Sequence, residues 1–241
     1  MITIKKDSKK QWLMIDNEIE GKVYLEPDAT HFGCAQAGPG AISASLYTYS
    51  FILPAWLRPK GHGIVFGLGS GAGIVMLLAL FPNLTLTVVE INTAIIALVK
   101  QCFPLIQHYI NQNRLIIINA NANDFNSAHV DFTLIDIYGG NENHRPNLQL
   151  LPKVLEKSDY VAANLISYFS EHDRINLLNA YTGFMLFPCY DCSTRQPGNW
   201  ILTNITHLPF DITQIELFPG VEKANKLFAQ LLQHLPASCF Y

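Results

Sequence analysis

Glycines occupy alternate positions in the run Gly67-Leu68-Gly69-Ser70-Gly71-Ala72-Gly73, and the acidic residue Glu90 follows 23 residues after the first of them (90 − 67 = 23). Apolar runs at residues 63–66 and 74–81 flank the glycines, which predicts a strand, a tight turn and a helix. Such a turn exposes backbone N–H groups and lets a ligand approach without meeting Cβ atoms. Glu90 ends the next strand-like run, where an acid can accept hydrogen bonds from a ribose diol. The spacing therefore predicts a nucleoside-binding site.

The later predicted strands deliver further polar residues. Asn121 and Ala122 follow the third strand, and Asn121 lies in a polar stretch that could read an adenine edge. Asp136 ends the fourth strand and Asn164 lies near the end of the fifth. In open α/β sheets ligands bind outside the carboxyl ends of the strands, so we expect an acid at this edge to be functional. Asn164 could instead only cap the turn that follows it.

Strands and helices alternate from residue 63 onward, which indicates a parallel sheet covered on both faces. We predict a Rossmann-like, doubly wound α/β fold with a mostly parallel seven-stranded sheet and antiparallel C-terminal strands. A small N-terminal β-hairpin region and a lead-in helix over residues 42–57 form residues 1–60, and the α/β domain forms residues 61–241. The expected hairpin strands are 11–17 and 21–25; the expected sheet strands are 64–67, 84–90, 114–119, 132–138, 160–166, 183–187 and 200–205; the expected helices are 71–81, 93–108, 147–157, 171–181 and 221–235.

Composition excludes several classes of protein. A net charge of −3 over 241 residues, without a Lys/Arg cluster, gives no footprint for nucleic acid or an anionic membrane. The longest apolar run, residues 74–81, is far shorter than the ~20 residues of a membrane span. With no apolar leader at its start and five cysteines, the chain is expected to be cytoplasmic with free thiols. Cys189 and Cys192 have redox spacing but stand apart from a first βα unit, and no spacing predicts a metal site.

Six short motifs occur in an order that resembles one family. After the Tyr-containing segment Leu46-Tyr47-Thr48-Tyr49 come the glycine turn and Val89-Glu90-Ile91; Asp136 precedes Pro146-Asn147-Leu148, and Asn164-Leu165 and Gly198-Asn199 follow. This order resembles class I S-adenosylmethionine-binding folds and, more closely, the spermidine synthase (polyamine aminopropyltransferase) family. The resemblance covers roughly residues 47 to 206.

The resemblance implies transfer of an aminopropyl group from decarboxylated S-adenosylmethionine to a polyamine amine, with methylthioadenosine leaving. It implies that Asp136 accepts the amine proton, that Tyr47 and Tyr138 line the amine channel, and that Glu90 holds the ribose. It further implies a small-molecule polyamine partner and a possible homodimer. The residues implied for the nucleoside co-substrate are Gly67, Gly69, Ser70, Gly71, Glu90, Asn121 and Ala122.

Two positions differ from the family pattern. Ser70 stands where the family has an Asp that binds the aminopropyl ammonium, and Asn121 stands where an Asp meets the adenine. Ser70 favours an alternative of the same fold, an S-adenosylmethionine-dependent methyltransferase, because an intact carboxylate would not be repelled. A third hypothesis is a non-catalytic nucleoside- or polyamine-binding homologue. A dinucleotide site is disfavoured because the glycine spacing fits it poorly.

Overall fold

A computed structural model describes residues 13–17, 22–26, 34–36, 52–137, 148–166, 171–190 and 197–206. Near the N-terminus, three strands form an antiparallel sheet in the order β1-β2-β3. β1 (Leu13–Asn17) and β2 (Lys22–Glu26) match the expected hairpin, and β3 (Cys34–Gln36) adds a strand that was not predicted. The pairing of β1 with β2 runs from Leu13 opposite Glu26 to Asn17 opposite Lys22.

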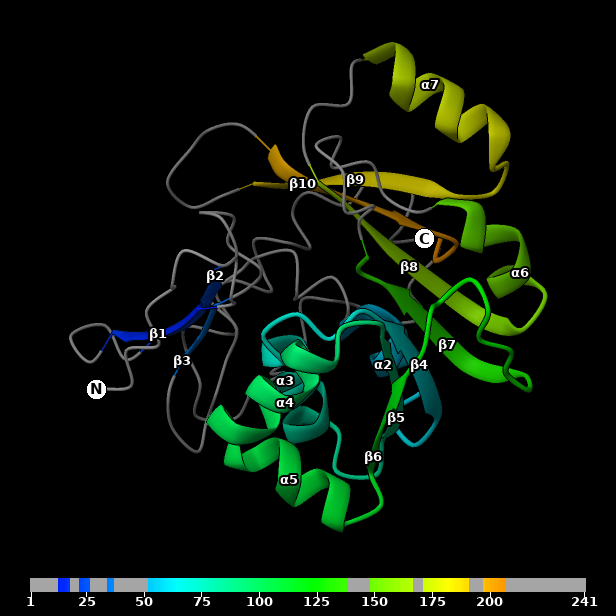
Figure 1. The fold of residues 1–241 in the computed structure, drawn as a ribbon. Coiled ribbons are helices and arrows are strands. Elements are labelled where there is room, and N and C mark those ends of the chain that lie inside the picture. The colour runs from blue at the N-terminus through cyan, green and yellow to red at the C-terminus, as the bar shows by residue number, and fades with distance from the viewer. Residues whose placement is uncertain are drawn as a thin grey trace, which may run out of the picture.

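The main sheet has seven strands in the order β6-β5-β4-β7-β8-β10-β9 (Figure 1). The five strands from β6 to β8 pair in parallel, whereas β10 is antiparallel to both β8 and β9. This order confirms the predicted mostly parallel sheet with an antiparallel C-terminal part. The strands are β4 (His62–Phe66), β5 (Thr85–Glu90), β6 (Leu115–Asn119), β7 (Val130–Ile135), β8 (Ser158–Ile166), β9 (Met185–Tyr190) and β10 (Pro197–Thr203).

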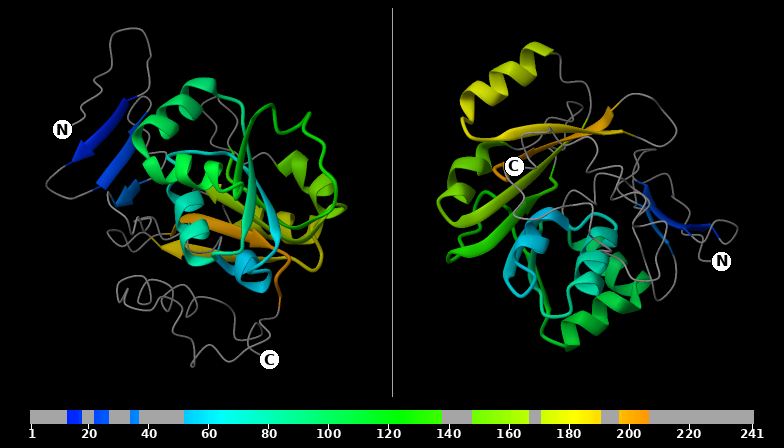
Figure 2. Two further views of the ribbon diagram at one scale, coloured as in Figure 1. Left: turned by 90° about the horizontal axis from the view of Figure 1, so that it is seen from below. Right: turned by 180° about the vertical axis from the view of Figure 1, so that it is seen from behind.

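Helices cover both faces of this sheet, as the near-continuous apolar strands require (Figure 2). Buried side chains of successive strand residues belong to two clusters: Val65 packs with α2, α3, α4 and α5, and its neighbours Ile64 and Phe66 pack with α6 and α7. None of the helices in the described ranges is long and apolar enough to cross a membrane. The helices are α2 (Ile52–Leu57), α3 (Ala72–Leu80), α4 (Thr93–Cys102), α5 (Pro104–Asn111), the 3-10 turn η1 (Leu148–Leu150), α6 (Leu151–Leu155) and α7 (Glu171–Ala180).

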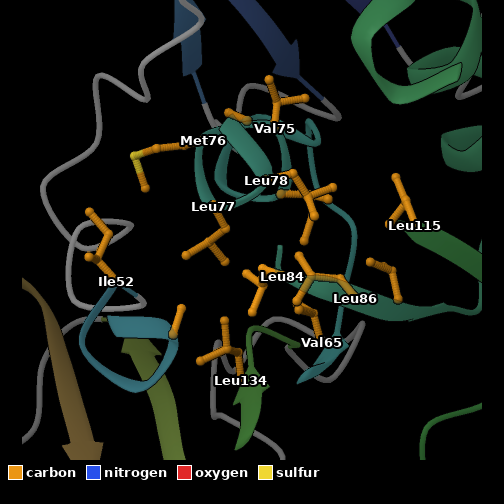
Figure 3. Packing of buried hydrophobic residues seen from close by; sticks show 14 of the residues in the cluster. Ile52, Val65, Val75, Met76, Leu77, Leu78, Leu84, Leu86, Leu115 and Leu134 are labelled. Atoms are coloured by element: carbon orange, nitrogen blue, oxygen red, sulfur yellow. The ribbon is translucent and has the colours of Figure 1, made fainter. Parts of the chain in front are cut away.

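Helix α3 anchors the larger cluster and thereby fixes the glycine turn that precedes it. Leu77 and Leu78 point from α3 toward the sheet, where Val65, Leu86 and Leu134 lie (Figure 3). All five side chains are almost completely buried. Full burial of one such aliphatic side chain stabilises a fold by about 1.5–3 kcal/mol, so the start of α3 is held firmly against the ends of the strands.

Four sequence predictions differ from the structure or lie wholly or partly outside it. The single helix expected over 93–108 is wrong, because Phe103 is extended and Pro104 begins a second helix. A proline disfavours the α conformation of the residue before it and lacks the N–H that would continue the helix. The strand expected over 132–138 ends at Ile135, so Asp136 follows the strand. The helix expected over 221–235 and the part of the lead-in helix before Ile52 lie outside the described residues.

The amino-terminal edge of the sheet contains a half-buried histidine. The ring of His62 lies between two threonines of β5, with Nδ1 2.9 Å from Thr85 Oγ1 and Nε2 3.2 Å from Thr87 Oγ1. The backbone N–H of His62 donates to Asp131 at 2.7 Å. Burial lowers the pKa of the imidazole from its usual 6.5, and the Asp131 carboxylate opposes part of this shift.

We therefore expect the stability of the fold to decrease below about pH 6.5. Because the pKa of His62 is lower in the folded state, the unfolded chain takes up a proton at a higher pH than the folded chain does. The contribution of neutral His62 to the free energy of unfolding is therefore fully present above this pH and is lost below it. Thermal unfolding between about pH 7.5 and 5.5 measures the effect, which should be smaller in His62→Gln. His108→Gln, at an exposed position of α5, is the matched control. An equal pH dependence in His62→Gln and the original chain would contradict the prediction.

Candidate active site

Three predicted site residues and Asn164 reach the carboxyl edge of the sheet at matching strand positions. Phe66 of β4 pairs with Val89 of β5 and Ile135 of β7, and the residues that follow these three are Gly67, Glu90 and Asp136. Ile135 in turn pairs with Ala163 of β8, so Asn164 is the next residue on that strand. The parallel register therefore brings the glycine turn, two carboxylates and an amide to one edge, where ligands bind in this class of sheet.

Gly67 joins the glycine turn to Asp136. Its N–H donates to the carbonyl of Val89 at 2.9 Å, and the N–H of Asp136 donates to the carbonyl of Phe66 at 2.8 Å. The φ angle of Gly67 is +99°, and a Cβ built there would lie 2.3 Å from the carbonyl oxygen of Asp136. A residue with a side chain could not occupy this position without separating the turn from β7. The glycine is therefore needed for close packing beside the predicted catalytic aspartate.

Glu90 holds the glycine turn in shape. One carboxylate oxygen accepts from the N–H of Leu68 at 3.0 Å and the other from the N–H of Asn92 at 2.8 Å. Asn119 supports the same segment, because its side-chain amide donates to the carbonyls of Glu90 and Ile91 at 2.9 Å each. Glu90 is 9% exposed. A carboxylate has about four acceptor positions, so these two bonds leave capacity for the hydroxyls of a ribose.

Ser70 lies buried in the turn, with 3% of its surface exposed. Its hydroxyl oxygen accepts from the N–H of Ala72, the first residue of α3, at 3.4 Å. Gly69 and Gly71, on either side, have positive φ angles of 51° and 77°, which glycine adopts readily. The start of α3 thus presents a neutral hydroxyl and N–H groups rather than a carboxylate.

Asn121 and Ala122 lie in the turn that follows β6. The carbonyl of Asn121 accepts from the N–H groups of Asp124 and Phe125 at 3.1 Å each. Its side-chain oxygen accepts from the N–H of Asn123 at 3.0 Å, so this oxygen stabilises the turn itself. Ala122 is buried in the smaller of the two hydrophobic clusters, whereas Asn121 is exposed.

A lysine of α6 fixes the far end of this turn. The ammonium group of Lys153 donates to the carbonyls of Asn123 at 3.1 Å and Phe125 at 2.6 Å. The ring of Phe125 packs edge-on against Phe66, with 6.1 Å between ring centroids. Together these contacts hold the turn after β6 against α6 and β4.

Asp136 belongs to a line of three polar side chains. The side-chain amide of Asn164 donates to Asp136 Oδ1 at 2.8 Å, and the side-chain amide of Asn199 donates to Asn164 Oδ1 at 2.8 Å. These residues follow β7 or lie within β8 and β10, so the antiparallel strand β10 contributes to the same edge. We call this set the Asp136–Asn164–Asn199 relay.

The predicted site residues are only partly covered by the structure. Gly67, Glu90 and Asp136 lie at the carboxyl edge, as do the other predicted turn residues described above. Tyr47, Tyr138 and Cys192 lie outside the described residues, as does the side chain of Cys189. Within the described part of the chain, no group of three His, Cys, Asp or Glu residues could hold a metal ion.

Sequence reasoning missed two supporting side chains. The sequence pattern places Asn119 only at the end of a strand and Lys153 only within a helix. Neither follows a motif, because their hydrogen bonds depend on backbone carbonyls from other segments. A polar residue at the end of a buried apolar strand is the available signal for Asn119. No comparable signal points to Lys153.

The described edge can bind and orient a polar ligand in three ways. Glu90 can accept hydrogen bonds from hydroxyls, and the start of α3 can donate N–H groups. Asp136, when ionised, can accept a proton or a hydrogen bond from a nucleophile. The arrangement suits a nucleoside next to a group that must lose a proton.

Comparisons with known proteins give similarity in structure rather than in sequence. No protein-family model matches the chain, and no curated protein matches it by sequence. A crystal structure described as a probable spermidine synthase from Corynebacterium glutamicum is 13% identical, with a TM-score of 0.64 over 91% of this chain and 85% of that chain. Spermidine synthase from Thermotoga maritima is also 13% identical, with a TM-score of 0.57 over 83% of this chain and 70% of that chain.

A methyltransferase of the same architecture is similar as well. Human methyltransferase-like protein 13, in complex with SAH, is 16% identical, with a TM-score of 0.51 over 78% of this chain and 90% of that chain. At these identities the similarity shows the fold. The chain therefore has the Rossmann-like fold that spermidine synthases share with class I methyltransferases.

Proposed function

We propose that this protein is a transferase that moves an aminopropyl group from decarboxylated S-adenosylmethionine to the amine of a polyamine. The observation that carries the proposal is the position of Asp136, a carboxylate held by Asn164 beside the glycine turn. The order of motifs that resembles the spermidine synthase family supports the same activity. So does the fold shared with structures described as spermidine synthases.

The reaction is a displacement at the CH₂ group next to a sulfonium. The lone pair of the amine nitrogen forms the new C–N bond, the C–S bond breaks, and methylthioadenosine leaves with that electron pair. The sulfonium is already a good leaving group, so the barrier lies in positioning and in freeing the amine. An alkylamine with a pKa near 10.4 is protonated at pH 7, and neutralising it costs roughly 4–5 kcal/mol. Asp136 would accept that proton and orient the nitrogen.

Glu90 and the glycine turn would bind the nucleoside part. The carboxylate of Glu90 would accept from the ribose hydroxyls while it keeps its bonds to the N–H groups of Leu68 and Asn92. Tyr47 and Tyr138 remain proposed for the amine channel, where aromatic faces attract an alkylammonium. Asn121 and Ala122 remain proposed for the adenine.

Ser70 favours a second candidate, an S-adenosylmethionine-dependent methyltransferase. The buried hydroxyl at this position is neutral, whereas the resemblance implies a carboxylate that would attract the ammonium of the aminopropyl group. A neutral residue there would not repel the carboxylate of intact S-adenosylmethionine. The two candidates therefore differ in which form of the co-substrate the turn accepts.

Calorimetric titration with three nucleosides separates these candidates. For aminopropyl transfer we expect methylthioadenosine and decarboxylated S-adenosylmethionine to bind at least about 10-fold more tightly than S-adenosylmethionine, a difference of about 1.4 kcal/mol. The reverse preference would favour methyl transfer. If none of the three binds, both proposals fail.

Replacement of Asp136 tests the chemical step. We expect Asp136→Asn to lower kcat for aminopropyl transfer by about 10²–10⁴, because an amide cannot accept the amine proton. The affinity for methylthioadenosine should stay within about 3-fold, since Asp136 acts on the acceptor. Asp159→Asn, at the opposite edge of the sheet, is the control and should transfer normally. Wild-type kcat in Asp136→Asn would refute the assigned role.

Replacement of Glu90 tests the nucleoside site. Glu90→Gln keeps the shape of the side chain but replaces an acceptor oxygen by an NH₂ group facing a backbone N–H. We expect affinity for methylthioadenosine to decrease by about 10-fold or more and the melting temperature to decrease as well. Glu156→Gln, an exposed residue after α6, is the matched control. Unchanged affinity in Glu90→Gln would show that the nucleoside binds elsewhere.

A further inference from the structure

The middle member of the Asp136–Asn164–Asn199 relay is a buried polar side chain. Asn164 is 1% exposed and lies in β8 between Ala163 and Leu165, which are completely buried. A buried amide costs free energy unless both of its ends are hydrogen-bonded. Asn164 meets this condition, because its NH₂ group reaches Asp136 and its oxygen reaches Asn199.

The strand register explains how Asn199 reaches Asn164. Asn164 lies opposite Ile201 of β10, and Asn199 lies opposite Ile166. Side chains two residues apart share one face of a sheet, so Asn199 is the diagonal neighbour of Asn164 across the antiparallel pair. The side-chain contact therefore follows from the pairing of β8 with β10.

The direction of the hydrogen bonds follows from chemistry. An ionised carboxylate has no donor, so the group of Asn164 that faces Asp136 must be its NH₂ group. Its carbonyl oxygen then faces Asn199, which must present its own NH₂ group. Each bond fixes the orientation of the next amide, and both amides donate toward Asp136.

We propose that Asn164 and Asn199 are positioning residues for Asp136. Asn164 delivers an N–H to one carboxylate oxygen, which fixes the rotation of the carboxylate beside the glycine turn. Asn199 keeps the Asn164 amide from turning over. The part of this inference that concerns transfer rests on the proposed function. The polarity of the relay, by which we mean the direction in which its two amides donate, does not.

Inverting the relay tests its polarity without any assay of activity. In Asn199→Asp the new carboxylate accepts only, so the Asn164 oxygen faces an acceptor in either orientation: the new carboxylate if Asn164 stays, or Asp136 if it turns over. Adding Asp136→Asn supplies a donor at the other end, and the whole line can reverse with both hydrogen bonds kept. We expect the melting temperature of Asp136→Asn/Asn199→Asp to exceed that of Asn199→Asp by about 4 °C or more.

Two further variants make the result specific. Asp136→Leu/Asn199→Asp removes the charge of Asp136 without supplying an N–H, so we expect it to melt below Asp136→Asn/Asn199→Asp. Asn204→Asp replaces an asparagine after the other end of β10, whose amide bonds the backbone of Asp159 and Val161. Its melting temperature should not rise when Asp136→Asn is added. Equal melting temperatures for the Asn and Leu double variants, or no recovery in either, would overturn the proposed polarity.

The role in transfer is measured by kinetics on the full chain. We expect Asn199→Asp to lower kcat by about 10-fold or more while the affinity for methylthioadenosine stays within about 2-fold, because only the carboxylate is misplaced. Asn199→Ser, which retains a donor on a shorter side chain, should lose less than Asn199→Asp. Equal kcat in Asn199→Asp and the original chain would overturn the positioning role. If the original chain transfers no aminopropyl group, the proposed function fails, and the melting temperatures still decide the polarity.

Discussion

The close packing of Gly67 against the carbonyl of Asp136 is the constraint on which the candidate site depends. A side chain at residue 67 would push the glycine turn away from β7, because its Cβ would overlap that carbonyl. The turn is attached to β5 through Val89 and Glu90, and Asp136 is attached to β8 through Asn164. Because residue 67 has no Cβ, the glycine turn, which suits a nucleoside, can pack directly against Asp136, the proposed base.

The fold is compatible with two transfer chemistries, and a few side chains at its edge distinguish them. Asp136 suits a substrate whose nucleophilic group must lose a proton to receive the transferred group. Ser70 is neutral, so at this position the start of α3 has no carboxylate to attract an ammonium group. Both residues lie on a rigid core that either chemistry could use, so the backbone alone does not select the co-substrate. The choice depends on the charge at each end of the ligand.

The sequence was sufficient to predict most strands and helices of the described sheet, because these depend on local patterns. Apolar runs located the strands, and glycine spacing located the turn that ends at α3. The break at Phe103 was predictable from Pro104, although helical segments lie on both sides of it. The contact between Asn164 and Asn199 was not predictable, since it needs the register of an antiparallel pair formed by residues 35 positions apart. The direction of the Asn121 side chain was not predictable either, because its oxygen accepts from the N–H of Asn123 in the same turn.

The position of β10 between β8 and β9 has a consequence for how the chain is made. In the described sheet, β9 is joined to the other strands through β10, although β9 is synthesised first. In a chain emerging from the ribosome, β4, β5, β6, β7 and β8 can therefore pair before β10, the strand that pairs with β9, has been synthesised. Asn199 arrives on that last strand, so the amide that orients Asn164 joins the site only after almost all of the sheet has been translated.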